Sequence, residues 1–203
     1  ALTLLGVYLT IGGLRNLCFG PSLDQLVGMD GEIWTGKFDF TLLRPVNVQF
    51  LASFRHWRLF ALFDLLLALG TLSVGIVQLQ HTLTWVEIGS FLITLAASVS
   101  ILYAILLIFS ALVLFNPGFL YTWIFDSIFQ MARYPVNLYP GRLRLVLTWI
   151  VPIGLMTTVP AQALTGELTP AFLLGSIAVA TVLVLAASAV FRFGLRRYSS
   201  ASS

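Results

Sequence analysis

Uncharged, mostly apolar stretches alternate with short polar segments along the 203-residue chain. Residues 65–86, 88–125, 145–166 and 168–191 contain no Asp, Glu, Lys or Arg. A helix needs about 20 apolar residues to cross the roughly 30 Å of hydrocarbon in a bilayer. Each stretch is long enough for at least one such helix. The pattern therefore predicts an all-α polytopic membrane protein.

Three of these stretches predict spanning helices directly, over 59–79, 85–115 and 170–193. The 85–115 run would be about 46 Å long at 1.5 Å per residue, so it has to tilt or project beyond the bilayer. Residues 1–18 contain a shorter apolar run, which we interpret as the end of a spanning helix whose beginning is missing from this sequence. Residues 194–203 form a polar tail.

Residues 116–166 allow two interpretations. In the first, 116–142 is a cytoplasmic loop and 143–164 crosses the bilayer, which places all basic residues inside. In the second, 118–134 crosses, and 135–166 dips into the outer half of the bilayer and returns as a re-entrant hairpin. The four prolines of residues 135–166 favour the second interpretation, because each removes a backbone donor and interrupts a helix. The arginines that it leaves outside count against it.

The composition excludes a water-soluble domain. Hydrophobic residues make up 59% of the chain and charged residues 9%, and the mean hydropathy is +0.96. Soluble domains are about 25% charged. There is too little polar surface here to cover a globule in water, so the solvent of most side chains is lipid.

The positive charges predict the orientation. Lys and Arg number 11 against 8 acidic residues, and they are concentrated in 15–58 and in 192–197. Because basic residues favour the cytoplasmic side, we expect 19–58 and the C-terminal tail to lie in the cytoplasm. This uneven charge reflects membrane orientation, and no nucleic-acid partner is expected. The single Cys18 allows no internal disulfide, and no metal site is expected.

The long polar segment, 19–58, has apolar residues at helical spacing in short pieces. Gly20–Pro21 and Arg44–Pro45 interrupt these pieces. Short amphipathic helices of this kind lie on a membrane surface or on a partner protein. This segment is therefore the first candidate for a docking site.

Residues 31–37 match the first seven positions of a phosphate-binding loop. Position eight is Phe38, where the magnesium-binding Ser or Thr would stand, and no apolar strand precedes the match. We therefore expect the glycines to shape a turn, and nucleotide binding by this chain is not expected.

Two aspartates lie in or near apolar helices, where a charge is costly and becomes a functional candidate. Asp64 falls about one turn into its predicted helix, and Arg58 or Arg55 could stabilise it there. Asp126 would lie near the bilayer centre under the second interpretation, so it lines a path or makes a structural ion pair. His56, between Arg55 and Trp57, is interpreted as an interfacial anchor.

The stretch Gly31-Glu-Ile-Trp-Thr-Gly-Lys-Phe-Asp39-Phe-Thr-Leu-Leu-Arg44-Pro45 resembles the cytoplasmic loop of type-two ABC exporter permeases, the group with an Asp followed by Leu-Leu-Arg-Pro. The later Tyr134-Pro-Val-Asn-Leu-Tyr-Pro140-Gly and Val159-Pro-Ala-Gln-Ala-Leu-Thr-Gly166 resemble the same group. The resemblance follows the same order over residues ~1 to ~197.

The resemblance implies the fold of a type-two ABC exporter transmembrane domain, N-terminally incomplete, with re-entrant helices before the last crossing. It favours the second interpretation of 116–166 and makes 19–58 a cytoplasmic coupling loop. The residues that it assigns to ATPase coupling are Glu32, Gly36, Asp39, Leu42, Leu43, Arg44 and Pro45. Asp126 and Tyr121 are the candidates for the substrate path.

The resemblance also implies partners. The chain would be a permease in the cytoplasmic (inner) membrane, with no ATPase of its own and no cofactor; ATP and magnesium would sit on a partner dimer of ABC ATPase subunits. A second permease, identical or related, would complete the path. Two other functions stay open: a non-transporting membrane anchor for an ATPase, and a lipid-handling enzyme with Asp64 or Asp126 as acid or base.

Overall fold

The computed structural model describes residues 2–28, 30–79, 82–116, 122–134, 138–145, 147 and 152–198. Helices account for most of these residues, and no strand occurs among them. The helices are α1 (Leu2–Cys18), α2 (Gly20–Asp24), α3 (Phe38–Leu42), α4 (Val48–Phe54), α5 (Ala61–Val77), α6 (Trp85–Phe115), α7 (Thr122–Gln130) with the 3-10 turn η1 (Met131–Arg133), α8 (Gly141–Leu145), α9 (Ile153–Thr165) and α10 (Pro170–Arg197).

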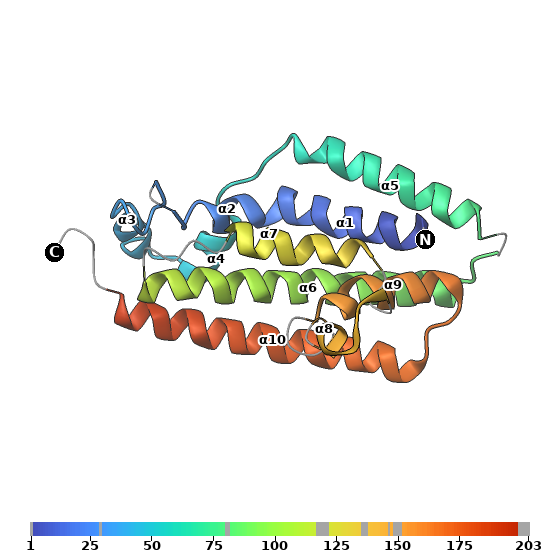
Figure 1. Ribbon diagram of the computed structural model, residues 1–203. Helices are drawn as coiled ribbons and strands as arrows, with labels where there is room; N and C mark the ends of the chain where they lie inside the picture. Colours follow the sequence, from blue (N-terminus) through green and yellow to red (C-terminus); the bar gives the residue numbers. More distant parts are fainter. Residues whose placement is uncertain are drawn as a thin grey trace.

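The long helices lie side by side in one elongated bundle (Figure 1). α10 packs along α6, α1 packs along α5, and α9 packs against α6. The short helices α2, α3 and α4 gather at the end where α10 finishes. The connections from α5 to α6 and from α9 to α10 lie at the opposite end. The 19–58 segment and the end of α10 therefore share one end of the bundle.

Local sequence signals explain where the longest helix begins. The Thr84 side chain accepts a hydrogen bond from the Glu87 amide, and the Glu87 carboxylate accepts one from the Thr84 amide. This reciprocal pair satisfies amide groups that a helix start leaves without partners. α6 then continues through 31 residues without a proline and ends at Phe115, as the sequence predicted.

Two described helices, α6 and α10, are long and apolar enough to cross a membrane, and α1 and α5 are shorter apolar helices. Of the expected crossing over 118–134, residues 118–121 lie outside the described part, and α7 with η1 covers 122–133. The nine residues of α7 extend only about 14 Å at 1.5 Å each. The chain leaves the helical region at Tyr134, with φ −110° and ψ 146°, because the residue before a proline is pushed into extended conformations.

Glycines let α1 and α5 approach each other closely. A Cβ atom built on Gly6 would lie 2.6 Å from Cα of Leu72, and one on Gly75 would lie 2.9 Å from the backbone nitrogen of Thr3. Real Cβ atoms do not come this close to backbone. Small residues allow such contacts between helices in lipid, where packing rather than exclusion of water drives association.

Candidate functional site

The 19–58 segment packs its apolar side chains into the same core as the long helices. Its buried apolar side chains are Phe19, Leu23, Leu26, Val27, Ile33, Phe38 and Ala52. Gly36, at φ +73°, provides the left-handed turn just before α3. The segment is thus a small folded unit at the end of the bundle.

An ion pair inside this segment joins the turns at 31–37 to the end of α4. Arg55 pairs with the Glu32 carboxylate, and its guanidinium also donates to the Thr41 hydroxyl at 3.0 Å. The Glu32 side chain is only 14% exposed. Glu32, assigned to ATPase coupling from the resemblance, therefore holds the segment together and presents little surface to a partner.

His56 belongs to the same cluster, although it was expected to be an interfacial anchor. Its Nε2 accepts a hydrogen bond of 2.8 Å from Nε of Arg55, which requires that nitrogen to be unprotonated. Burial and the charge of Arg55 lower the pKa of His56. The backbone of His56 is tied to α2, because its amide donates to the Ser22 hydroxyl at 2.8 Å.

The outer face of α3 is apolar and exposed. Phe40 is 69% exposed and Leu43 is 80% exposed, while Leu42 packs against the core. Leu42 was expected to share the docking surface with Leu43. However, adjacent helical residues point about 100° apart, and Leu42 follows Phe38 by four residues onto the buried face. Phe40, three residues before Leu43, lies on the outer face, a relation that helical spacing could have indicated.

Asp39 and Arg44 have different surroundings. The helix ends at Leu42, so Arg44 and Pro45 lie in the exposed turns beyond it. Asp39 lies beside Tyr198, the residue that follows α10. The rings of Phe38 and Tyr198 also meet edge to face, with centroids 5.5 Å apart. α3 therefore rests on the end of α10.

Titration of Tyr198 is expected to loosen this contact. Burial and the Asp39 carboxylate raise the pKa of Tyr198 to about 12. Because the ordinary value is about 10, the neutral phenol contributes stability that is complete below about pH 10 and is lost as the pH rises toward about 12. Tyr198→Phe keeps the ring and should remove the loss of stability between about pH 10 and about pH 12. The difference in phenolate absorbance between the two proteins, followed against pH, reports the titration of Tyr198. A midpoint of this difference near pH 10, the ordinary pKa of tyrosine, would contradict the prediction.

A polar network links α4 to the two longest helices. The Gln49 amide nitrogen donates to the Tyr103 hydroxyl of α6 at 3.3 Å and to the Ser188 hydroxyl of α10 at 3.0 Å. The hydroxyls of Ser53 and Tyr103 share a hydrogen bond of 2.9 Å. The 19–58 segment is thus joined to α6 and α10 by side-chain hydrogen bonds as well as by apolar packing.

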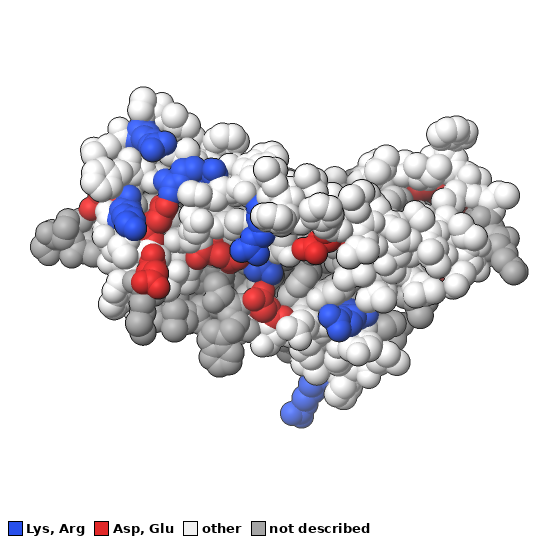
Figure 2. All heavy atoms as spheres, turned by 90° about the horizontal axis from the view of Figure 1, so that it is seen from above, with Lys and Arg blue, Asp and Glu red and all other residues white. Residues whose placement is uncertain are grey.

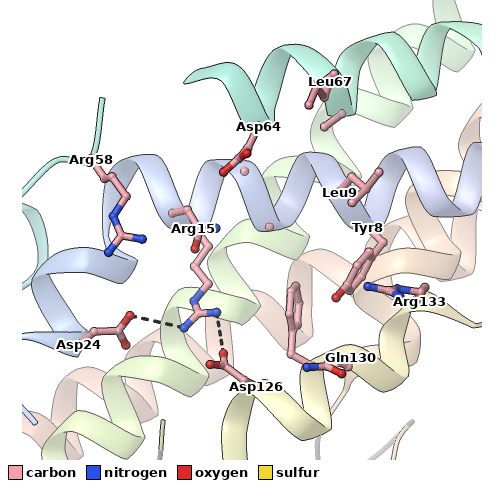
Figure 3. Close-up of a pocket in the computed structure, with 15 residues that line it drawn as sticks. Tyr8, Leu9, Arg15, Asp24, Arg58, Asp64, Leu67, Asp126, Gln130 and Arg133 are labelled. Carbon is pink, nitrogen blue, oxygen red and sulfur yellow. Dashed lines mark hydrogen bonds and ion pairs between the residues drawn. The ribbon is translucent and has the colours of Figure 1, made fainter. Parts of the chain in front are cut away.

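A charged cleft of about 620 Å³ lies between α1, α5 and α7, beside the 19–58 segment (Figure 3). Arg15, in the last turn of α1, pairs with Asp126 at 2.9 Å and with Asp24 at 3.6 Å. Its guanidinium also lies over the ring of Phe125, 4.9 Å from the centroid. One buried arginine therefore joins α1, α2 and α7.

This pairing gives Asp126 a structural ion pair, one of its two expected roles. The partners of Asp126 belong to the last turn of α1 and to α2, so it lies toward the 19–58 end and away from the middle of the bundle. Asp64 lines the same cleft with Arg58, whereas Arg55 pairs with Glu32 instead. Tyr121, the other candidate for the substrate path, lies outside the described residues.

Charged side chains are unevenly distributed along the face of the molecule that Figure 2 shows. They gather over the end that carries α2 to α4 and over the middle of the face. The half toward the start of α6 is almost uncharged there. Such a surface suits a protein with one polar end and an apolar body in lipid.

Residues 31–37 form a run of turns. The Thr35 hydroxyl and amide both donate to the carbonyl of Gly31 at 2.9 Å. A Cβ on Gly31 would lie 2.6 Å from the carbonyl oxygen of Val27. The backbone of Gly31 is therefore packed against the preceding turn, as the sequence predicted for a structural glycine.

A family model described as ABC-2 family transporter protein matches residues 1–202. The chain belongs to this family. The match covers almost the whole ABC-2 chain and confirms the resemblance to type-two ABC permeases. No curated protein and no solved structure matches the chain.

The assignment makes this ABC-2 protein a multi-pass membrane component of an ABC transporter, and the all-α fold agrees with it. The family is a permease component without a catalytic domain of its own, and it implies an ATPase partner.

Proposed function

We propose that the chain is the permease subunit of an ATP-driven exporter. With a second permease, identical or related, it encloses the substrate path, and a dimer of ABC ATPase subunits that bind ATP and magnesium drives it. The observation that carries the proposal is the exposed apolar face of α3, formed by Phe40 and Leu43 on a segment that is otherwise folded. Apolar side chains exposed in this way outside lipid are typical of an interaction surface.

The contacts of the 19–58 segment support a coupling role. α3 meets the end of α10 through Tyr198, and α4 bonds to α6 and α10 through Gln49. A partner that pushes on Phe40 and Leu43 would therefore move a folded unit attached to both long helices. Arg44, exposed beside this face, would contact a carboxylate of the ATPase.

The docking face is tested by replacing Phe40 or Leu43 with serine. Each change removes an exposed apolar anchor, so we expect at least about tenfold less ATPase to co-purify with the chain from native membranes. Phe50→Ser is the matched control, since Phe50 is 59% exposed in the same 19–58 segment but lies on α4. The control should retain the ATPase.

Normal recovery of the ATPase by both α3 variants would contradict the docking assignment. If the amount of ATPase recovered per inserted chain is unchanged and only the amount of inserted chain falls, the variant affects folding or insertion and not docking. Substrate-stimulated ATPase activity of the reconstituted complex then separates an exporter from a passive anchor, because an anchor gives no stimulation.

The proposed orientation puts 19–58 and the C-terminus in the cytoplasm of an inner-membrane protein, and 135–166 in an outer re-entrant hairpin. Single cysteines in a Cys18→Ser background test it. Glu167→Cys and Arg142→Cys should react with an impermeant thiol reagent in intact cells, and Val46→Cys only after permeabilisation; all three positions are exposed. Labelling of Arg142→Cys only after permeabilisation would restore 116–142 as a cytoplasmic loop.

A further inference from the structure

The cleft between α1, α5 and α7 contains charges of both signs that the docking role does not use. Its charged lining consists of Arg15, Arg58, Arg133, Asp24, Asp64 and Asp126. Three arginines and three aspartates give a formal charge of zero. Tyr8, Leu9, Leu67 and Phe129 supply an apolar wall along the same space. Its volume of about 620 Å³ lies in the range of small-molecule sites.

Two buried atoms in this cleft lack hydrogen-bond partners among the described residues. They are Nε of Arg15 and Oδ1 of Asp24. The side chain of Arg15 is only 10% exposed although it lines the cleft. Buried polar atoms are rarely left unpaired, because their lost hydration is costly. The charges of Arg15 and Asp24 are therefore not fully compensated by hydrogen bonds among the described residues.

Three further charged side chains, Arg58, Arg133 and Asp64, line the cleft from different parts of the chain. Figure 3 shows Arg58 on the α2 side, Arg133 beside Tyr8 at the other end, and Asp64 between them along the cleft. Within the part of the chain that the structure describes, Arg58, Arg133 and Asp64 form no ion pair. Arg133 lies over the ring of Tyr8, 5.7 Å from its centroid. The unpaired charges are thus two guanidinium groups and one carboxylate.

This arrangement indicates the chemistry of a ligand. Guanidinium groups bind phosphate oxygens with directed hydrogen bonds, and a carboxylate pairs with an ammonium group. A purely anionic ligand would leave Asp64 beside a second negative charge, and a purely cationic ligand would leave the arginines unpaired. We propose that the cleft binds a zwitterionic group that carries a phosphate and an amine, such as phosphoethanolamine, with the phosphate at Arg58 or Arg133 and the amine at Asp64.

The inference concerns binding by this chain and rests on the proposed function only for the side of the membrane from which the cleft is reached. The ligand could be a lipid headgroup or a soluble phosphate ester, since both present the same groups. The apolar wall beside the charges accommodates part of an acyl chain or another apolar part of the ligand.

Binding is tested with the full chain in detergent, without ATP. It is titrated with phosphatidylethanolamine and with phosphatidylglycerol that carry the same fluorescent acyl chain, and the anisotropy of the label is followed. The proposal expects tighter binding of phosphatidylethanolamine, because only this lipid offers an ammonium group to Asp64. Equal binding of the two lipids, or tighter binding of phosphatidylglycerol, would overturn it.

Variants of each sign separate the two charges. Arg58→Gln and Arg133→Gln are made separately, and one of them should weaken the binding of both lipids by about tenfold, because it removes a charge-assisted bond to the phosphate that they share. If neither variant weakens the binding, the phosphate assignment is wrong. Asp64→Asn should weaken the binding of phosphatidylethanolamine by a similar factor and should not weaken that of phosphatidylglycerol, which loses a repulsive charge, so the preference disappears. The matched controls are Arg192→Gln and Asp30→Asn, which remove exposed charges outside the cleft. Loss of the preference in the controls as well would overturn the assignment.

Soluble phosphoethanolamine distinguishes the two sources. If it displaces the labelled lipid at millimolar concentration, the headgroup suffices and a soluble ester fits the cleft. If it fails while the lipid preference depends on Asp64, the ligand is the lipid. The binding measurement involves no ATPase, so failure of the docking variants and failure of this proposal are separate results.

Discussion

Replacement of Gly6 by leucine is expected to separate α1 from α5 and to prevent normal folding. A Cβ atom built at this position would lie 2.6 Å from Cα of Leu72 and 2.8 Å from its nitrogen. Backbone cannot yield as a flexible side-chain end can, so the helices must move apart along their contact. We expect a loss of about 3 kcal/mol, the upper part of the usual cost of overpacking. Thermal unfolding of the purified chain and its yield in membranes measure the loss.

Gly70→Leu is the matched control for this experiment. Gly70 lies on α5, the same helix that Gly6 contacts, but no atom lies within 4 Å of a Cβ built there. A leucine at Gly70 adds an apolar side chain to an exposed surface and should leave the melting temperature within a few degrees. If Gly6→Leu melts like the control, the close approach of α1 and α5 is not required for the fold.

Replacement of Arg15 by glutamine is expected to have the second largest effect. The change removes the counter-ion that Asp24 and Asp126 share, and it leaves two carboxylates beside each other. Breaking a buried pair costs about 3–5 kcal/mol, and partial exposure of the two carboxylates reduces this to about 2 kcal/mol. α7 should then lose its attachment to α1, which increased proteolysis near 122–130 would report.

The loss in Arg15→Gln should shrink as the pH falls. Burial raises the pKa of Asp24, Arg15 opposes this rise, and the charge of Asp126 adds to it. Without Arg15 the pKa of Asp24 rises further above its unfolded value, so protonation below neutral pH favours the folded state of the variant. Arg15→Gln combined with Asp126→Asn should recover part of the stability. A loss that is the same at pH 5 and pH 8 would show that the ion pairs are not its cause.

The sequence predicts the long helices well because their signals are local. The 85–115 prediction matches α6 at both ends, since the Thr84 and Glu87 start and the uninterrupted apolar run are visible in the chain. The 59–79 prediction differs from α5 by two residues at each end. Within 118–134, the described residues are α-helical from Thr122 to Gln130 and then form a 3-10 turn, a change that apolar composition does not indicate.

The candidate site is less predictable, because its partners lie far apart in sequence. Arg15 and Asp126 are 111 residues apart, and Gln49 and Ser188 are 139 apart. No spacing of residues along a single helix or turn predicts such pairs. The inward position of Leu42 and the outward position of Phe40, by contrast, follow from helical geometry once the start of α3 is known. The position of that start depends on the turn at Gly36, which packing of the whole segment decides.

The continuity of α10 has a mechanical consequence. The helix runs for 28 residues, about 42 Å, and its only proline is at its first position. It therefore behaves as a rod that bends little between its two ends. A displacement of α3 against Tyr198 would be carried along this rod to Thr169 on the far side of the bundle. Under the proposed coupling role, the left-handed turn at Gly166, φ +72°, would be the pivot, and movement of α3 at one end would displace the α9–α10 connection at the other.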